Sequence, residues 1–131
     1  MECEEIRVDL RTIPHSADRQ RSAQLLFRLN HTLPFSEEYN ALLRELLGKN
    51  LGEGSTIAPP LSGAALDMLK IGRGVFVNSN LLAMARGGIT IGDHARIAAN
   101  VQLLSNNHDP YDLDILPCKP ILICKSAWIG A

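Results

Sequence analysis

Aliphatic residues recur every six positions in the stretch from residue 89 to 108, which reads ITIGDHARIAANVQLLSNNH. The period is carried by Ile91, Ile97 and Leu103, and a small or β-branched residue follows four places after each of the first two. A helix repeats about every 3.6 residues and a strand about every 2, so neither element produces a period of six. A chain that turns one corner per hexapeptide does produce it, and hexapeptide repeats are a signature of the β-helix.

The phrase that opens this stretch, aliphatic-x-aliphatic-small, occurs three times. It is LKIG at Leu69–Gly72, ITIG at Ile89–Gly92 and ILIC at Ile121–Cys124. Three hexapeptides make one triangular coil of about 18 residues, yet the first two phrases are 20 positions apart. The simplest place for the extra pair is Gly87 and Gly88. The repeat predicts about two to three such coils between residue 57 and residue 131.

A longer insertion separates the second phrase from the third. These two phrases are 32 positions apart, which is 14 more than three hexapeptides. The excess begins at or near His108 and continues as DPYDLDILPCKP, whose prolines and aspartates are typical of a loop. We expect this loop to leave the coil after Leu103 and to reach toward a neighbouring subunit. A histidine where an extruded loop begins is a natural place for chemistry.

Two short amphipathic helices are predicted before the repeat. The first spans about residues 16–30, with Ser16 as N-cap, and the second follows the N-cap Ser36 and ends at Gly48. Leucines supply the apolar stripes, Leu25, Leu26 and Leu29 in the first helix and Leu42, Leu43, Leu46 and Leu47 in the second. Helices this short must bury those stripes against a partner, so we expect them to pack on each other or on the coil.

The chain therefore divides into a helical cap, residues 1–54, and an incomplete β-helix, residues 55–131. Residues 1–15 alternate apolar and polar side chains in part and form either a short strand or an extended arm. The predicted class is all-β with a helical cap, built on a single-stranded parallel β-helix. With 46% hydrophobic and only 5% aromatic residues, the composition suits a narrow coil interior filled by aliphatic side chains.

Charge and cysteine usage bound the function classes. The formal net charge of −1 gives no basic face for nucleic acid or a membrane surface. Three cysteines without C-x-x-C spacing indicate neither a disulfide framework nor a zinc site. The start lacks the basic and apolar regions of a signal peptide, and no apolar run approaches the ~18 residues of a membrane span. We expect a cytoplasmic, soluble protein with reduced thiols.

Six phrases together give a family resemblance that a hexapeptide repeat alone would not give. They are LLFRLNHT from Leu25, IAPPL from Ile57, VNSN from Val77, ITIGDH from Ile89, SNNHDP from Ser105 and AWIGA from Ala127. With them the chain resembles the maltose and galactoside O-acetyltransferases, which are sugar acetyltransferases of the left-handed β-helix hexapeptide class. The resemblance covers most of the chain from about residue 16 onward.

The resemblance implies transfer of an acetyl group from acetyl-CoA to a sugar hydroxyl, without a metal, in a homotrimer with active sites between subunits. It places the family's catalytic histidine at His108. It makes Asn78 and Arg19 substrate-binding residues, and it places Trp128 beside the CoA groove.

The chain also departs from the family pattern. Relatives carry a short polar residue where this chain has Ala64, and many carry an aspartate where it has Ala85 and Arg86, so the identity of the acceptor does not follow from the resemblance. Relatives continue past the AWIGA phrase for several coils that hold most CoA contacts. We therefore expect a chain truncated at its C-terminus, with little or no acetyl transfer unless those coils are added. The alternative is a non-catalytic hexapeptide-repeat protein that lacks the CoA site.

Acetyl transfer from a thioester needs a base that takes the hydroxyl proton, and histidine suits this role because its pKa in water lies near 6.5. His108 is the candidate base. Asn107 or Ser105 would orient its ring, and Asp109 or Asp112 would support the imidazolium. A covalent acyl-enzyme is not required.

Each candidate also has a structural interpretation. A lone histidine in a polar loop is commonly only solvated, and an arginine such as Arg19 is commonly a solvated helix residue. Asn78 and Asn80 are typical of tight corners, where asparagine tolerates a left-handed backbone. A metal-dependent hydratase resembling the γ-carbonic anhydrases would need three coil histidines, and the coil contains only His94, an expected corner residue, and His108.

Overall fold

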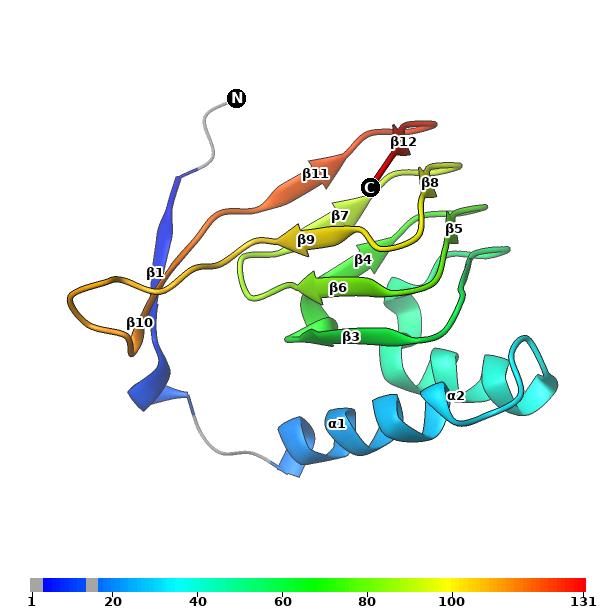
Figure 1. Ribbon diagram of the computed structural model, residues 1–131, viewed down its shortest axis with the longest axis horizontal. Helices are drawn as coiled ribbons and strands as arrows, with labels where there is room; N and C mark the ends of the chain where they lie inside the picture. Colours follow the sequence, from blue (N-terminus) through cyan, green and yellow to red (C-terminus); the bar gives the residue numbers. More distant parts are fainter. Residues whose placement is uncertain (1–3, 14–16) are drawn as a thin grey trace.

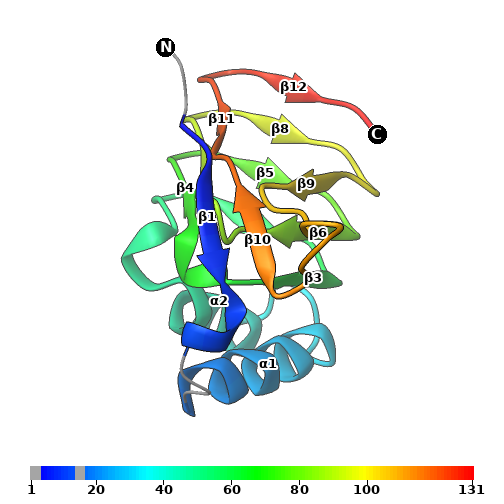
Figure 2. The ribbon, with the colours of Figure 1, turned by 90° about the vertical axis from the view of Figure 1, so that its left-hand side faces the viewer.

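A computed structural model describes residues 4–13 and 17–131. Three parallel sheets form the sides of a triangular prism, with two helices at one end (Figures 1 and 2). One side has the strand order β3 (Leu61–Ala64), β6 (Leu81–Met84) and β9 (Gln102–Leu104). A second has the order β4 (Leu69–Ile71), β7 (Ile89–Ile91) and β11 (Ile121–Ile123). The third has the order β2 (Thr56–Ile57), β5 (Phe76–Val77), β8 (Arg96–Ile97) and β12 (Trp128–Ile129).

The register of the third side measures the length of each coil. Ile57 pairs with Val77 and Val77 pairs with Ile97, so the first two coils are each 20 residues long. The expected 18-residue coil is therefore wrong. The period is six from Ile71 through Val77 to Ala83, but eight from Ala83 to Ile91, so the additional pair lies at the corner between β6 and β7. In the first coil, the corresponding corner holds the 3₁₀ turn η3 (Leu66–Met68).

The third coil is longer at this same corner. Ile97 pairs with Ile129, a step of 32 residues, so 12 residues are added to the 20-residue coil. Between β9 and β11 the chain leaves the prism and returns through β10 (Ile115–Cys118). The predicted exit of this loop from the coil is confirmed. Gly87 lies where the loop departs, and a Cβ there would be 2.6 Å from the carbonyl oxygen of Ser105, which explains the need for glycine.

The core is a stack of aliphatic side chains inside the prism. Ile57, Val77 and Ile97 pair in register, and none is more than 1% exposed. Outward residues of the same strands are polar or only partly buried, so each short strand keeps the alternation of a half-buried sheet. Burial of these columns is the main favourable term holding one coil on the next.

The helices α1 (Ala17–Asn30) and α2 (Glu37–Leu47) close the lower end of the prism (Figure 1). Ser36 caps α2 by accepting from the Tyr39 backbone N–H at 3.1 Å, and Gly48 ends it with a positive φ of 56°, as predicted. Ser16, the predicted cap of the first helix, lies outside the described residues. The remaining 3₁₀ turns are η1 (Leu10–Thr12) and η2 (Gly48–Asn50). No helix in the described ranges is long and apolar enough to cross a membrane.

Two polar contacts fasten the helices to the first coil. The Asn30 side chain donates to the Leu61 carbonyl at 2.8 Å and accepts from the Leu61 N–H at 2.9 Å. The Tyr39 hydroxyl, fully buried, donates to the carbonyl of Ile57. Both contacts satisfy backbone groups of the first coil, which has no coil beneath it to pair with. Burial raises the pKa of Tyr39 to about 12, so the hydroxyl stays a donor at neutral pH.

The N-terminal strand β1 (Ile6–Asp9) pairs antiparallel with β10 in the extruded loop, as Figure 2 shows. Its register joins Ile6 to Cys118 and Asp9 to Ile115. Of the two interpretations of this segment, the short strand is therefore the one observed. Residues over a hundred positions apart in sequence form this small sheet, which ties the loop to the start of the chain.

We predict that Tyr39→Phe destabilises the protein by about 1–3 kcal/mol, because it leaves the buried Ile57 carbonyl without its donor. Chemical denaturation monitored by circular dichroism measures this loss. Tyr111→Phe is the matched control, since Tyr111 is 98% exposed and its loss of a hydroxyl should cost less than about 0.5 kcal/mol. Equal stabilities for the two variants would show that the Tyr39 contact does not hold the helices to the coil.

Candidate functional site

His108 lies in the extruded loop between β9 and β10, where the backbone forms an irregular hairpin. The N–H of Asn107 donates to the Pro117 carbonyl at 3.1 Å, and the N–H of Asp109 donates to the Ile115 carbonyl at 2.9 Å. The N–H of His108 itself donates to the Asn107 side-chain oxygen at 2.8 Å. The histidine backbone is thus held on both sides, while its side chain is exposed.

The imidazole of His108 has one fixed hydrogen bond. Its Nδ1 lies 2.7 Å from the carbonyl oxygen of Leu113. Because a carbonyl oxygen can only accept, Nδ1 carries the hydrogen and donates it. In the neutral ring the lone pair is then on Nε2, which is the arrangement a general base requires.

The four side chains expected to assist His108 are engaged elsewhere. The Ser105 hydroxyl donates to the Met84 carbonyl at 2.5 Å, and Asn107 contacts the backbone of His108 rather than its ring. Asp109 forms an ion pair with Arg7 of β1, and Asp112 forms one with Arg11 of η1 at 3.2 Å. The ring is oriented by a backbone carbonyl, a partner that no side-chain motif announces.

Two of the ion-paired groups show their surroundings in their titration. The pKa of Asp109 lies below its ordinary value of 3.8, first because the Tyr111 N–H donates to it and second because Arg7 does. The pKa of Asp9 is likewise lowered, by hydrogen bonds from Arg11. Both carboxylates are charged at neutral pH, so strand β1 and the loop are joined by charge as well as by backbone pairing.

Asn78 and Trp128 lie on the β2–β5–β8–β12 side of the prism. Asn78 follows β5, is exposed, and accepts a hydrogen bond from the Ser79 N–H at 2.7 Å. It does not have the left-handed backbone expected of it, whereas Asn80 does, with a φ of 68°. Trp128 is on β12 with 73% of its surface exposed. In Figure 1 these strands lie at one end of the prism and the loop with His108 projects from the other.

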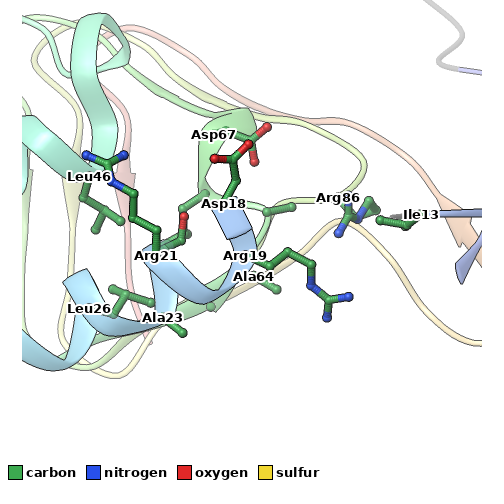
Figure 3. Close-up of a pocket in the computed structure, with 14 residues that line it drawn as sticks. Ile13, Asp18, Arg19, Arg21, Ala23, Leu26, Leu46, Ala64, Asp67 and Arg86 are labelled. Carbon is green, nitrogen blue, oxygen red and sulfur yellow. The ribbon is translucent and has the colours of Figure 1, made fainter. Parts of the chain in front are cut away.

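Arg19 lines a cavity of about 570 Å³ between α1 and the corner of the first coil (Figure 3). Ala64 and Arg86, where the chain departs from the family pattern, line the same cavity. Asn78, His108 and Trp128 do not line it. One chain therefore supplies the predicted site residues in three separate places.

His94 is a corner residue, as expected, with a φ of 62° and a backbone N–H that donates to the Arg73 carbonyl. Within residues 4–13 and 17–131, no group of three His, Cys, Asp or Glu side chains is arranged to hold a metal ion.

Two proteins of known name resemble this chain in sequence. Nodulation protein L of Rhizobium leguminosarum bv. viciae is 34% identical over 128 residues, which cover 88% of this chain and 66% of the relative. The galactoside O-acetyltransferase of Escherichia coli (strain K12) is 30% identical over 119 residues, which cover 86% of this chain and 58% of the relative. No family model matches the chain. The chain thus spans about two thirds or less of the length of these relatives.

Solved structures agree with these relatives. A hexapeptide-repeat containing acetyltransferase from Vibrio cholerae matches with a TM-score of 0.80 at 34% identity, over 88% of this chain and 66% of that one. The chain belongs to the hexapeptide-repeat acetyltransferases. A galactoside acetyltransferase in complex with coenzyme A matches with a TM-score of 0.72 at 26% identity, over 87% of this chain and 65% of that one. The expected left-handed parallel β-helix is confirmed.

In this hexapeptide-repeat acetyltransferase, two contributors to the loop were missed from sequence: Arg7 and Arg11. A signal existed, because a short alternating segment with basic residues precedes a loop rich in aspartates. Opposite charges on two segments do not by themselves predict pairing, since most exposed charges are simply solvated.

We predict that Asp109 titrates below 3.8 and that Arg7→Gln raises its pKa part of the way back, because one of its two main stabilising donors is lost. Since the folded-state pKa is depressed, the contribution of Asp109 to loop order is present above pH 3.8 and is lost as the pH falls through the folded value. Carboxyl carbon shifts followed by NMR over a pH series measure both effects. Arg73→Gln, which removes the ion pair to Glu53 elsewhere on the coil, is the control and should leave Asp109 unchanged. An ordinary titration of Asp109 in the unsubstituted protein would contradict the observed ion pair.

Proposed function

We propose that this chain supplies the base and the acceptor-binding part of an acetyl-CoA-dependent O-acetyltransferase that acts on a sugar hydroxyl. The observation that carries the proposal is the tautomer of His108: Nδ1 donates to the Leu113 carbonyl, so Nε2 is available as a base. The family membership supports acetyl transfer as the reaction class, and the sugar acceptor is taken from the galactoside relatives.

The proposed reaction is direct attack without a covalent enzyme intermediate. Nε2 of His108 takes the proton of the acceptor hydroxyl as its oxygen attacks the thioester carbonyl of acetyl-CoA. The imidazolium that forms is stabilised by the Leu113 carbonyl, which already accepts from Nδ1. Collapse of the tetrahedral adduct breaks the carbon–sulfur bond, and the proton passes from Nε2 to the departing thiolate of CoA.

The proposed active enzyme is a homotrimer in which each site is built by two copies of the chain. Support comes from the positions of the candidate residues, since the loop with His108 and the strands near Asn78 and Trp128 lie at opposite ends of one prism (Figure 1). The loop also exposes apolar surface, with Tyr111 98% and Leu113 66% exposed, as a loop that contacts a neighbour would. Arg19 and Asn78 are proposed to hold the acceptor, and Trp128 to lie beside the CoA donor.

We predict that His108→Ala lowers the rate of acetyl transfer by at least about 100-fold, the usual contribution of a general base. Because the chain spans only part of its relatives, the assay uses the 131-residue protein and a version extended by the C-terminal coils of a relative, with acetyl-CoA and a panel of sugars. His94→Ala is the matched control, a histidine at a coil corner that should leave the rate nearly unchanged. An extended enzyme that stays active after His108→Ala would refute the proposed base.

A further inference from the structure

The cavity beside α1 is the largest hollow along the described chain, and its charges are separated. It holds about 570 Å³, within the usual range for small-molecule sites. Arg19 and Arg86 both extend toward the side of the cavity where Ile13 lies, as Figure 3 shows, while Asp18 and Asp67 lie together on another side. A ligand in this cavity meets guanidinium groups at one end and carboxylates at the other.

Arg86 is a cation that the described part of the chain does not neutralise. It is half-buried at the corner after β6, and no carboxylate of the described residues forms a salt bridge with it. Arg21 also lines the cavity, but its guanidinium is engaged by Glu45 at 2.9 Å. A half-buried guanidinium that faces a cavity is a strong site for a carboxylate or a phosphate, which it binds through two parallel hydrogen bonds.

The carboxylates fit the rest of such a ligand. Asp18 and Asp67 form no salt bridge among the described residues, and carboxylates are acceptors for hydroxyl groups. Ala64 and Gly63 form the wall next to them and leave room rather than adding a competing polar group. The combination suits a molecule that carries several hydroxyls and one anionic group.

We propose that this cavity binds an acidic sugar, through Arg86 with Arg19 at its anionic group and through Asp18 and Asp67 at its hydroxyls. In treating this ligand as the acetyl acceptor, the assignment rests on the proposed function, and it narrows the acceptor from sugars in general to uronates or sugar phosphates. The binding itself needs neither acetyl-CoA nor catalysis.

The test is isothermal titration of the 131-residue protein with galactose, galacturonate and galactose 6-phosphate at low salt. Either acidic sugar should bind at least about tenfold more tightly than galactose, and added sodium chloride should weaken it. The two acidic probes distinguish a carboxylate site from a phosphate site. Equal affinity for galactose, or no binding of either acidic sugar, overturns the proposal.

Variants locate the site. Arg86→Gln should weaken the acidic sugar about tenfold or more, and Arg86→Lys should keep part of the affinity because it keeps the charge without the planar fork. Arg44→Gln is the matched control, an exposed arginine of α2 that lies outside the cavity, and it should change nothing. An unchanged affinity in Arg86→Gln with an intact circular dichroism spectrum overturns the assignment.

The outcomes separate this inference from the proposed function. Acetylation of a neutral sugar in the extended enzyme, with no binding of the acidic sugars, would overturn only the acidic acceptor. Tight binding of an acidic sugar that depends on Arg86, without any acetyl transfer in the extended enzyme, would support the cavity assignment and overturn the acetyltransferase proposal.

Discussion

The stacking of one coil on the next, with a fixed offset of 20 residues, is the constraint on which the rest of this structure depends. Parallel pairing at that offset brings backbones so close that a Cβ at Gly52 would lie 2.1 Å from the carbonyl oxygen of Gly72. Only one corner of the triangle tolerates additional residues, and every insertion is there. The 3₁₀ turn of the first coil, the glycine pair of the second and the long loop of the third all lie between the β3–β6–β9 side and the β4–β7–β11 side. That corner consequently holds both His108 and Arg86.

Much of the fold could be predicted because its signals are local and periodic. The six-residue period marks the buried column of Ile57, Val77 and Ile97, and Ser36 and Gly48 mark the limits of the second helix. The coil length was wrong because the first coil takes its extra residues around Leu66, where no glycine pair is present to reveal them. Ala65 adopts the left-handed backbone there, with a φ of 54°.

The site was less predictable, because its key contacts are not between side chains of a motif. His108 was selected from the loop and the family phrase, but its partner is the backbone of Leu113, and any residue at that position would present the same carbonyl. The pairing of β1 with β10 joins the two ends of the chain, so no local pattern contains it. Arg86 was noted as a departure from the family pattern, and only the structure places it beside Arg19 in one cavity.

The account stands or falls on a site that one copy of the chain does not complete. The most direct measurement is complementation between two variants of the extended enzyme, His108→Ala and Asn78→Ala, that are each impaired alone. If each site takes His108 from one copy and Asn78 from the next, random mixed trimers contain intact sites at about one quarter of their interfaces and recover a corresponding part of the activity. If mixing restores no activity, His108 and Asn78 do not act across an interface between copies, and the proposed shared site is wrong.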